Sequence, residues 1–212
     1  MTIAPFHGWP RSALDFFDGL EHHNSKEWFH ANKSTYDRDV RGPMESLLAE
    51  LADELGDGVV SRPNRDTRFS ADKTPYKTTV YGRIDRPRGG GYYVRLHRDG
   101  LFIGGGLYAP DRETLGRMRA AIAADRSGAE LESIVAELVG GGARLLTDGA
   151  LKTAPRGYPI DHPRIELLRL PHLAGGIEHP VRPWLHTAVA KDRILDGWHA
   201  VQPLLDWVER WM

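Results

Sequence analysis

Apolar residues recur at helical spacing along roughly the first quarter of the chain. Residues 12–23 place apolar side chains three residues apart, and Ser12 is the predicted N-cap. A second amphipathic helix is expected over residues 24–40. We predict that Gly42 and Pro43 interrupt it, because proline lacks the amide hydrogen that a helix interior uses. A third, leucine-rich helix follows this interruption.

The middle of the chain changes from the helical period to the alternation of strands. Segments 78–86, 91–98 and 101–108 alternate apolar and polar residues, as half-buried strands do. Asp99 and Gly100 are predicted to form a two-residue type I′ turn between the last two strands. In the resulting register one face is core, and the other face combines polar side chains with glycines: Tyr93, Arg95, His97, Gly104 and Gly106. Without side chains at these glycines a ligand could approach the backbone closely; alternatively the glycines accommodate the Tyr93 ring or a β-bulge.

The remainder of the chain returns mainly to helical spacing. A helix is expected to start at Asp111, and Ser127 with Glu130 forms a capping box that is predicted to open the next one. Residues 141–181 are rich in glycine and proline, so we expect irregular structure there. Two further helices are expected after residue 182.

Helices on both sides of a run of strands are typical of the α+β class. We therefore predict an α+β fold whose central antiparallel sheet, about residues 59–108, is flanked by N-terminal and C-terminal helices. No repeat, low-complexity tract or linker interrupts the pattern. Residues 1–212 are accordingly predicted to form a single domain.

Composition narrows the possible classes of protein. The chain has 41% hydrophobic and 27% charged residues, as globular proteins do, and no apolar run long enough to span a bilayer. The first residues lack the pattern of a secretory signal, so we expect a cytoplasmic protein with no membrane partner. The absence of cysteine excludes disulfides, thiol nucleophiles and thiolate metal sites. None of the ten histidines has the spacing of a zinc helix, so neither a metal nor a cofactor is predicted.

Charge is distributed unevenly along the chain. The net charge is −1, yet residues 62–98 contain ten Lys and Arg against three Asp, a local charge of +7. Such an asymmetry can attract anionic partners. Acidic side chains from flanking helices could equally neutralise it.

The segment "RPNRDTRFSADKTPYK", residues 62–77, concentrates this charge. A strand is expected to run toward Phe69 and to end in a turn at Ser70. Asp66 and Asp72 are predicted to orient the neighbouring cations or to act as general base. The predicted anion clamp on this segment consists of Arg62, Arg65, Arg68, Lys73 and Lys77.

The same segment resembles the signature of a bacterial family of about this length. Its mark is Arg-x-x-Arg-Asp-x-Arg-Phe followed by Asp/Asn-Lys-x-x-Tyr, which residues 62–76 match. The resemblance extends to "NSKEWFHANKSTYD", "GGYYVRL", "GLFIGGGLYAP" and "LKTAPRGYPIDHP", and so covers nearly the whole chain. The family is catalogued as a domain of unknown function. The resemblance therefore implies a shared site without implying a particular reaction.

Residues outside this segment are predicted to complete the site. Arg95 joins the clamp, and Tyr76 and Tyr93 form its walls. His162, between an aspartate and a proline, is the candidate proton carrier. A second basic and aromatic loop either closes the pocket or is solvated, and its residues are Lys152, Arg156 and Tyr158.

Three functions are consistent with these features. The first is a protein that binds, or an enzyme that acts on, a small phosphorylated or carboxylated ligand. The second is a nucleic-acid-binding module whose bases would stack on Tyr92, Tyr93 and Phe102. The third is a structural or protein-interaction domain in which the charged segment is an internal ion-pair network. The patterns give no indication of an oligomeric state.

Overall fold

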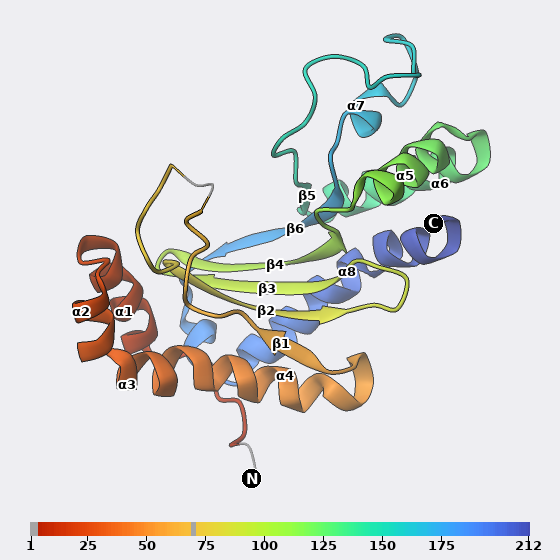
Figure 1. Ribbon diagram of the computed structural model, residues 1–212. Coiled ribbons are helices and arrows are strands. Elements are labelled where there is room, and N and C mark those ends of the chain that lie inside the picture. Colours follow the sequence, from red (N-terminus) through yellow and green to blue (C-terminus); the bar gives the residue numbers. More distant parts are fainter. Residues whose placement is uncertain (1–3, 69–70) are drawn as a thin grey trace. The chain divides into compact units, whose positions relative to one another are not determined.

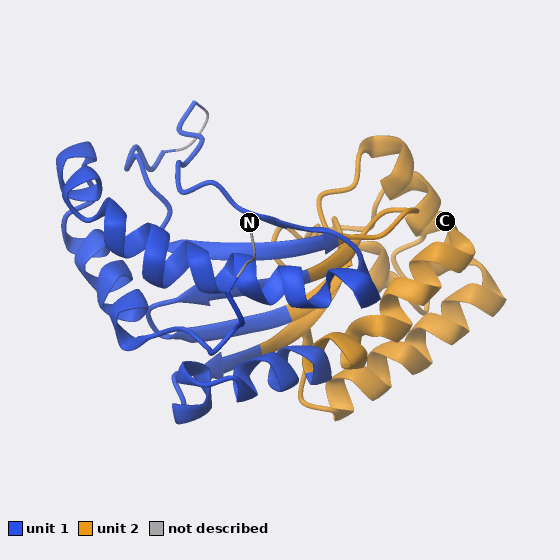
Figure 2. Ribbon diagram, turned by 90° about the horizontal axis from the view of Figure 1, so that it is seen from below, with its two compact units in different colours: residues 1–84, 93–103, 178–196 blue, residues 85–92, 104–177, 197–212 orange. Residues whose placement is uncertain are grey.

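The computed structural model describes residues 4–68 and 71–212. Within these ranges the chain divides into two compact units, each built from several stretches of sequence (Figure 2). Unit 1 comprises Met1–Ile84, Tyr93–Ile103 and Glu178–Asp196, and unit 2 comprises Asp85–Tyr92, Gly104–Ile177 and Gly197–Met212. The single domain predicted for residues 1–212 stays a prediction.

The sequence of unit 1 opens with helices. These are α1 (Arg11–His22), α2 (Lys26–Ala31), α3 (Lys33–Thr35), the π-helix η1 (Tyr36–Arg41) and α4 (Gly42–Leu55). The prediction that Gly42 and Pro43 interrupt the helix is wrong. The amide of Gly42 donates to the carbonyl of Asp37, five residues earlier, and α4 continues directly from η1. Pro43 is the second residue of α4, where its missing amide hydrogen leaves one helical bond unmade, and the helix continues past it.

The strands form a six-stranded sheet within the described residues, in the order β1-β2-β3-β4-β6-β5 (Figure 1). Their bounds are β1 (Gly58–Val60), β2 (Thr79–Asp85), β3 (Gly91–His97), β4 (Gly100–Leu107), β5 (Arg144–Leu145) and β6 (Leu173–Pro180). The sheet is antiparallel; for example, Val59 lies opposite Arg83 and Arg144 lies opposite Gly176. The predicted α+β class with an antiparallel sheet and flanking helices is therefore confirmed.

The remaining helices follow the sheet in the sequence. They are α5 (Arg112–Ala123), α6 (Asp125–Gly140), α7 (Ile165–Leu168), the 3-10 helix η2 (Pro183–His186) and α8 (Val189–Trp211). Asp111 caps α5 as predicted, because its side chain accepts a hydrogen bond from the amide of Thr114 at 2.7 Å.

The two faces of the sheet in unit 1 differ in cover. A Cβ added to Gly82 would lie 2.8 Å from Met44 and 3.1 Å from Leu48, so α4 packs directly on this face of β2 (Figure 1). Val80 and Ile84 share that face and are fully buried. The residues of β2 that alternate with these, beginning with Tyr81, point to the opposite face. Their side chains are half-buried or exposed. This opposite face is called the open face below.

Unit 2 has its own core, formed where α5, α6 and α8 meet. Met118, Leu131 and Trp207 are fully buried in one cluster there. The indole nitrogen of Trp207 donates to the carbonyl of Ser127 at 2.8 Å. The hydroxyl of Ser127 itself donates to the carbonyl of Ala121 at 2.6 Å.

Two predicted helix caps are consequently wrong. Ser127 lies inside α6, which begins at Asp125, and its hydroxyl is used for the bond to the preceding helix. Ser12 lies inside α1, where Pro10 occupies the N-cap position, and its hydroxyl donates to the buried carboxylate of Asp39 at 2.8 Å. In both cases a tertiary hydrogen bond replaces the local one.

The predicted hairpin turn and the predicted extent of the sheet also need correction. β3 ends at His97 and β4 starts at Gly100, so Arg98 and Asp99 form the connection. A type I′ turn needs a positive φ at both central residues, and among the described non-glycine residues only Ala109 has one. The sheet extends beyond residues 59–108, because the segment expected to be irregular supplies β5 and β6 as well as α7.

Candidate functional site

The segment of residues 62–77 forms a loop with a short two-stranded neck, which we call the charged loop. The amide of Arg65 donates to the carbonyl of Pro75, and the amide of Lys77 donates to the carbonyl of Pro63, both at 2.9 Å. The strand predicted to run toward Phe69 ends at Val60. Phe69 and the turn predicted at Ser70 lie outside the described residues.

The two carboxylates of the charged loop each pair with an arginine of the same loop. Arg65 donates to Asp72 at 2.5 Å, and Arg68 donates to Asp66 through two nitrogens at 3.0 and 2.7 Å. The hydrogen bonds from Arg68 lower the pKa of Asp66, and the Thr74 amide and hydroxyl do the same, ahead of Arg65, for the pKa of Asp72. Both carboxylates are therefore ionised acceptors that already hold a cation, which makes them better orienters than general bases.

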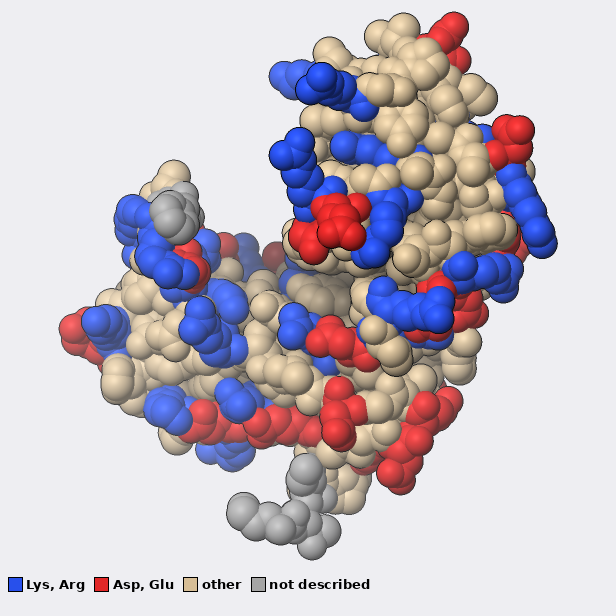
Figure 3. Space-filling view, turned by 45° about the vertical axis from the view of Figure 1, so that its right-hand side comes forward, with Lys and Arg blue, Asp and Glu red and all other residues tan. Residues whose placement is uncertain are grey.

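The other three cations of the charged loop pair with no carboxylate of a described residue. The ammonium of Lys73 donates to the carbonyl of Thr67 at 2.8 Å, and that of Lys77 donates to the carbonyl of Arg62 at 3.0 Å. Arg62 is exposed. Basic side chains dominate the surface of the charged loop, with acidic ones among them (Figure 3).

Tyr76 anchors the charged loop rather than facing solvent. It is only 5% exposed, and its ring stacks on Phe29 with centroids 4.0 Å apart and planes 9° apart. The side-chain amide of Asn24 accepts from the Tyr76 amide at 3.0 Å and donates to its carbonyl at 2.9 Å. The tyrosine of the resembled signature thus joins the loop to α2 and to the residues just before it.

The predicted proton carrier belongs to unit 2. His162 is half-buried, and its Nδ1 accepts a hydrogen bond from the amide of Arg164 at 3.0 Å. Its ring makes an edge contact with Tyr158, at a centroid distance of 6.4 Å. Lys152 and Arg156 are exposed. These contacts fit an ordered turn, and a role in proton transfer stays a prediction.

A continuous row of contacts crosses the open face of unit 1, and we call it the aromatic–basic band. The ammonium of Lys77 lies over the ring of Tyr81 at 5.1 Å, and the Tyr81 and Tyr93 rings are 5.3 Å apart. Tyr93 meets the edge of Phe102 at 6.0 Å, and the Arg95 guanidinium lies over Phe102 at 5.3 Å. The band continues to Glu178 and His97. Strands β2, β3, β4 and β6 contribute to it, so residues far apart in the sequence converge.

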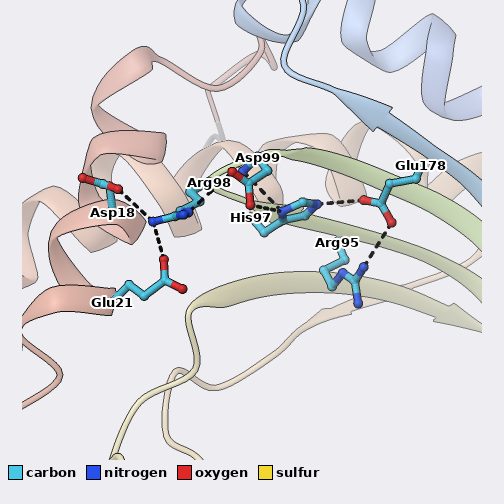
Figure 4. Close-up of polar contacts among 7 residues, drawn as sticks. All are labelled: Asp18, Glu21, Arg95, His97, Arg98, Asp99 and Glu178. Atoms are coloured by element: carbon cyan, nitrogen blue, oxygen red, sulfur yellow. Dashed lines mark hydrogen bonds and ion pairs between the residues drawn. The ribbon is translucent and has the colours of Figure 1, made fainter. Parts of the chain in front are cut away.

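Glu178 bridges the two polar members of β3 (Figure 4). One carboxylate oxygen accepts from a terminal nitrogen of Arg95 at 3.3 Å, and the other lies 2.7 Å from Nε2 of His97. The amide of Asp99 donates to Nδ1 of His97 at 3.3 Å, so Nε2 carries the hydrogen and donates to Glu178. Both nitrogens of His97 are engaged, and Arg95 shares its carboxylate with this histidine.

Arg98, three residues further along, contrasts with Arg95. It lies within 3.1 Å of Asp18, 2.6 Å of Glu21 and 3.5 Å of Asp99 (Figure 4). Its charge is thus surrounded by three carboxylates. The two side chains are similarly exposed, 37% for Arg95 and 40% for Arg98, but Arg95 has one carboxylate partner, and its Nε is buried without a hydrogen-bond partner among the described residues.

The predicted base-stacking residues do not form one surface. Tyr92 belongs to unit 2, where its buried ring lies 5.3 Å from the ring of Trp198. Phe102 is 4% exposed beneath Arg95, and only Tyr93 is half-buried on the open face. The ring that accompanies Tyr93 is Tyr81.

Two members of the band were missed by the sequence reasoning. Glu178 belongs to β6, and the run "LAGGIEHP" lacks clear alternation because its first four residues are all buried. Tyr81 belongs to a predicted strand, but it was not selected. Its odd position in β2, facing away from Val80 and Gly82, was the available signal.

No cluster of three or more His, Asp or Glu side chains arranged to hold a metal ion occurs in the described ranges. None of the helices in the part of the chain that the structure describes is long and apolar enough to cross a membrane.

Comparison with known proteins identifies a family and no curated relative. No curated protein matches the chain. The matching family carries the description "conserved hypothetical protein", and the match spans nearly the whole chain, as the resemblance of the charged loop had suggested. With residues 12–207 matched, the chain belongs to the conserved hypothetical protein family DUF2461.

Proposed function

We propose that this protein binds a small anionic ligand, phosphorylated or carboxylated, over the aromatic–basic band of unit 1. The observation that supports this most directly is the state of Arg95. Its guanidinium lies over the ring of Phe102, is partly exposed, and shares one carboxylate with His97. An arginine held in this way keeps donors available for the bidentate bonds that phosphate and carboxylate accept.

The neighbours of Arg95 suit a ligand with a planar or apolar portion beside its anionic group. The rings of Tyr81 and Tyr93 lie 5.3 Å apart on the same face and are half-buried. Aromatic rings provide apolar contact area while their hydroxyls can bond to polar groups. Lys77 lies over Tyr81 at the start of the band and adds a second cation.

Glu178 has two roles in this proposal. It fixes the guanidinium and the imidazole in place, and as an anion it competes with an incoming ligand. The ligand is therefore expected to bind those hydrogen-bond donors of Arg95 that Glu178 does not occupy, and to compete with Glu178 for the others. We propose binding, and we assign no reaction to it.

Isothermal titration calorimetry with phosphate, pyrophosphate, a sugar phosphate and a dicarboxylate tests the proposal. Hydrogen bonds to charged groups contribute roughly 1.5–3 kcal/mol, so Arg95→Gln should weaken binding about tenfold or more. Arg98→Gln is the matched control, because it removes an arginine of the same chain segment whose charge is already surrounded by carboxylates. Glu178→Gln should strengthen binding. Absence of binding by the unchanged protein, or equal loss in both arginine variants, would refute the proposal.

The charged loop supports a second role, as a structural ion-pair network. Arg65 and Arg68 each already hold a carboxylate of the loop. Both pairs are solvent-exposed, and exposed pairs contribute only about 0–1 kcal/mol. Arg68→Ala should therefore leave global stability nearly unchanged while it increases amide exchange in the loop. A loss of anion binding in Arg68→Ala, with unchanged loop exchange, would move the proposed site to the loop.

A further inference from the structure

Lys77 lies at the end of the aromatic–basic band that is opposite to Glu178. Its ammonium lies over the ring of Tyr81 at 5.1 Å and donates to the carbonyl of Arg62 at 3.0 Å. A lysine ammonium has three donors, so two remain after this hydrogen bond. Within the described ranges, no carboxylate forms an ion pair with Lys77. The band therefore has a cation with remaining donors at this end as well as at Arg95.

The pairing of β2 with β3 shows where Lys77 lies relative to Arg95. The amide of Arg86 donates to the carbonyl of Gly90 at 3.0 Å, which fixes the register of the hairpin that joins the two strands. Counting back in this antiparallel register places Tyr81 opposite Arg95, on neighbouring strands about 4.8 Å apart. Because the ammonium of Lys77 is 5.1 Å from the centroid of the Tyr81 ring, the two cations are separated by a distance on the order of 10 Å.

The carboxylate of Glu178 makes the two sides of Arg95 different. The strand order β2-β3-β4-β6 places Glu178 on the opposite side of Arg95 from Lys77 (Figure 1). Glu178 accepts a hydrogen bond from Arg95 at 3.3 Å (Figure 4). An anionic group on the β6 side of Arg95 would therefore meet a like charge, whereas one on the β2 side would meet the ammonium of Lys77. A ligand with two anionic groups is thus directed toward β2.

The surface between the two cations is aromatic. The rings of Tyr81 and Tyr93 are 5.3 Å apart with their planes inclined at 35°, and both residues are half-buried. Tyr93 precedes Arg95 by two residues in β3, so their side chains point to the same face. Such rings provide contact area for planar or apolar groups. A ligand that reaches from one cation to the other would pass over these rings.

We propose that the ligand of this site is a planar dianion whose two anionic groups lie at opposite ends. This rests on the proposed function, since one anionic group binds Arg95 as described there. The second group binds the remaining donors of Lys77, and the planar middle lies against Tyr81 and Tyr93. Both cations accept carboxylate or phosphate as the anionic group.

Isothermal titration calorimetry with rigid aromatic acids at physiological ionic strength tests the second contact. Terephthalate, naphthalene-2,6-dicarboxylate and biphenyl-4,4′-dicarboxylate hold two carboxylates at increasing separation, and benzoate, 2-naphthoate and biphenyl-4-carboxylate are the matched monoanions. At least one dicarboxylate should bind about fivefold or more tightly than its monoanion, because its second contact is intramolecular. Lys77→Gln should reduce that ratio to about two, the statistical value for two equivalent ends, and should leave the monoanion affinity nearly unchanged.

Two further variants separate this contact from general electrostatics. Lys26→Gln removes an exposed lysine of α2 and should retain the preference for the dicarboxylate. Lys77→Glu should reverse the preference. The aminomethyl analogue of the preferred dicarboxylate, in which an ammonium replaces one carboxylate, should bind this variant more tightly than the dicarboxylate does.

The results distinguish this inference from the proposed function. If no dicarboxylate is preferred over its monoanion, or if the preference survives Lys77→Gln or is lost in Lys26→Gln, the second contact is overturned. The same holds if Lys77→Glu does not reverse the preference. Monoanion binding that depends on Arg95 would still stand in each of these cases. Monoanions that fail to bind the unchanged protein, or that bind independently of Arg95, would instead overturn the proposed function and this inference with it.

Discussion

Replacing Tyr36 with phenylalanine should stabilise the fold, although the tyrosine is almost fully buried. Tyr36 lies in the π-helix and is 4% exposed, with its ring 5.5 Å from Phe16 and 5.2 Å from Phe29. Its hydroxyl is buried and has no hydrogen-bond partner among the described residues. The substitution keeps the ring contacts and removes only an unsatisfied polar group. Tyr36 is also part of the aromatic group that holds Phe29 beneath the ring of Tyr76.

The expected size of the effect follows from the hydroxyl. Burying a hydroxyl without a partner costs about 1–3 kcal/mol in proteins, so the free energy of unfolding should rise by about 1 kcal/mol or more. Burial also raises the pKa of Tyr36 to about 12, from an ordinary value near 10. The unfolded chain therefore loses this proton first, and stability present below pH 10 falls as the pH rises toward 12. That slope amounts to at most about 2.7 kcal/mol and should be absent in Tyr36→Phe.

Urea unfolding at pH 7 and at pH 10.5 measures both effects. Tyr81→Phe is the matched control, because it removes a hydroxyl from a half-buried ring on the open face and should change stability by less than about 0.5 kcal/mol. Destabilisation of Tyr36→Phe at pH 7 would refute the reasoning, since it would mean that the hydroxyl makes a bond in solution. An unchanged alkaline slope would show that another group carries the pH dependence.

Four further substitutions test how the structure is held together. Asn24→Ala removes two hydrogen bonds to the Tyr76 backbone and should lower stability by about 1–3 kcal/mol. It should also speed proteolysis within the charged loop. Unchanged proteolysis would mean that the stacked ring of Tyr76 alone holds the loop in place. Gly106→Ala should lower the melting temperature strongly, because Gly106 has a φ of 135° and an added Cβ would lie 2.3 Å from a carbonyl of β6. Gly116→Ala in α5, where an added Cβ has nothing within 4 Å, should instead raise stability by about 0.5–1 kcal/mol. Equal effects of the two substitutions would contradict the packing argument. Burial lowers the pKa of His179, so the unfolded chain binds a proton at this histidine first, and stability should fall as the pH drops below about 6.5. His179→Gln should reduce this fall in a curve of stability against pH. A slope that persists in the variant would exclude His179 as its source.

The elements that the sequence predicted well are those in which one face alone is buried. Helix α1 and strands β2 and β3 follow the predicted segments within one or two residues, because their apolar spacing reports directly on a core-facing side. The Asp111 cap was predictable for a related reason, since its bond partner lies three residues away. A contact between residues so close along the chain can be predicted from the local sequence.

The elements that were missed depend on partners far along the chain. β6 has four consecutive buried residues at its start, and the place of Gly106 beside Leu173 and Ala174 joins segments almost seventy residues apart. A strand of this kind has no local alternation of apolar and polar residues by which the sequence could predict it. Ser12 and Ser127 illustrate the same limit, because each looks like a cap until a distant carboxylate or a carbonyl of the previous helix takes its hydroxyl.

The candidate site was predicted by composition and only partly by geometry. The excess of cations in residues 62–98 pointed to Arg95 and Lys77, which belong to the aromatic–basic band. The same excess pointed to Arg65 and Arg68, whose acidic partners lie within the charged loop. Glu178, which bridges Arg95 and His97, comes from the strand that the sequence did not reveal.

The number of carboxylates around each arginine decides which cations remain available to a ligand. Arg86 lies within ion-pair distance of Asp206 and Glu209, and Arg98 within ion-pair distance of three carboxylates. These partners come from α8, from α1 and from the hairpin, so the acidic remainder of the chain neutralises much of the basic segment. A local charge of +7 therefore says where arginines are, and not which of them can bind. Because Arg95 has one carboxylate and shares it with His97, replacing Arg95 and replacing Arg98 should affect different properties. Arg95→Gln should mainly weaken binding, whereas Arg98→Gln should leave binding nearly unchanged and weaken the contact of α1 with the β3–β4 connection by no more than about 1 kcal/mol.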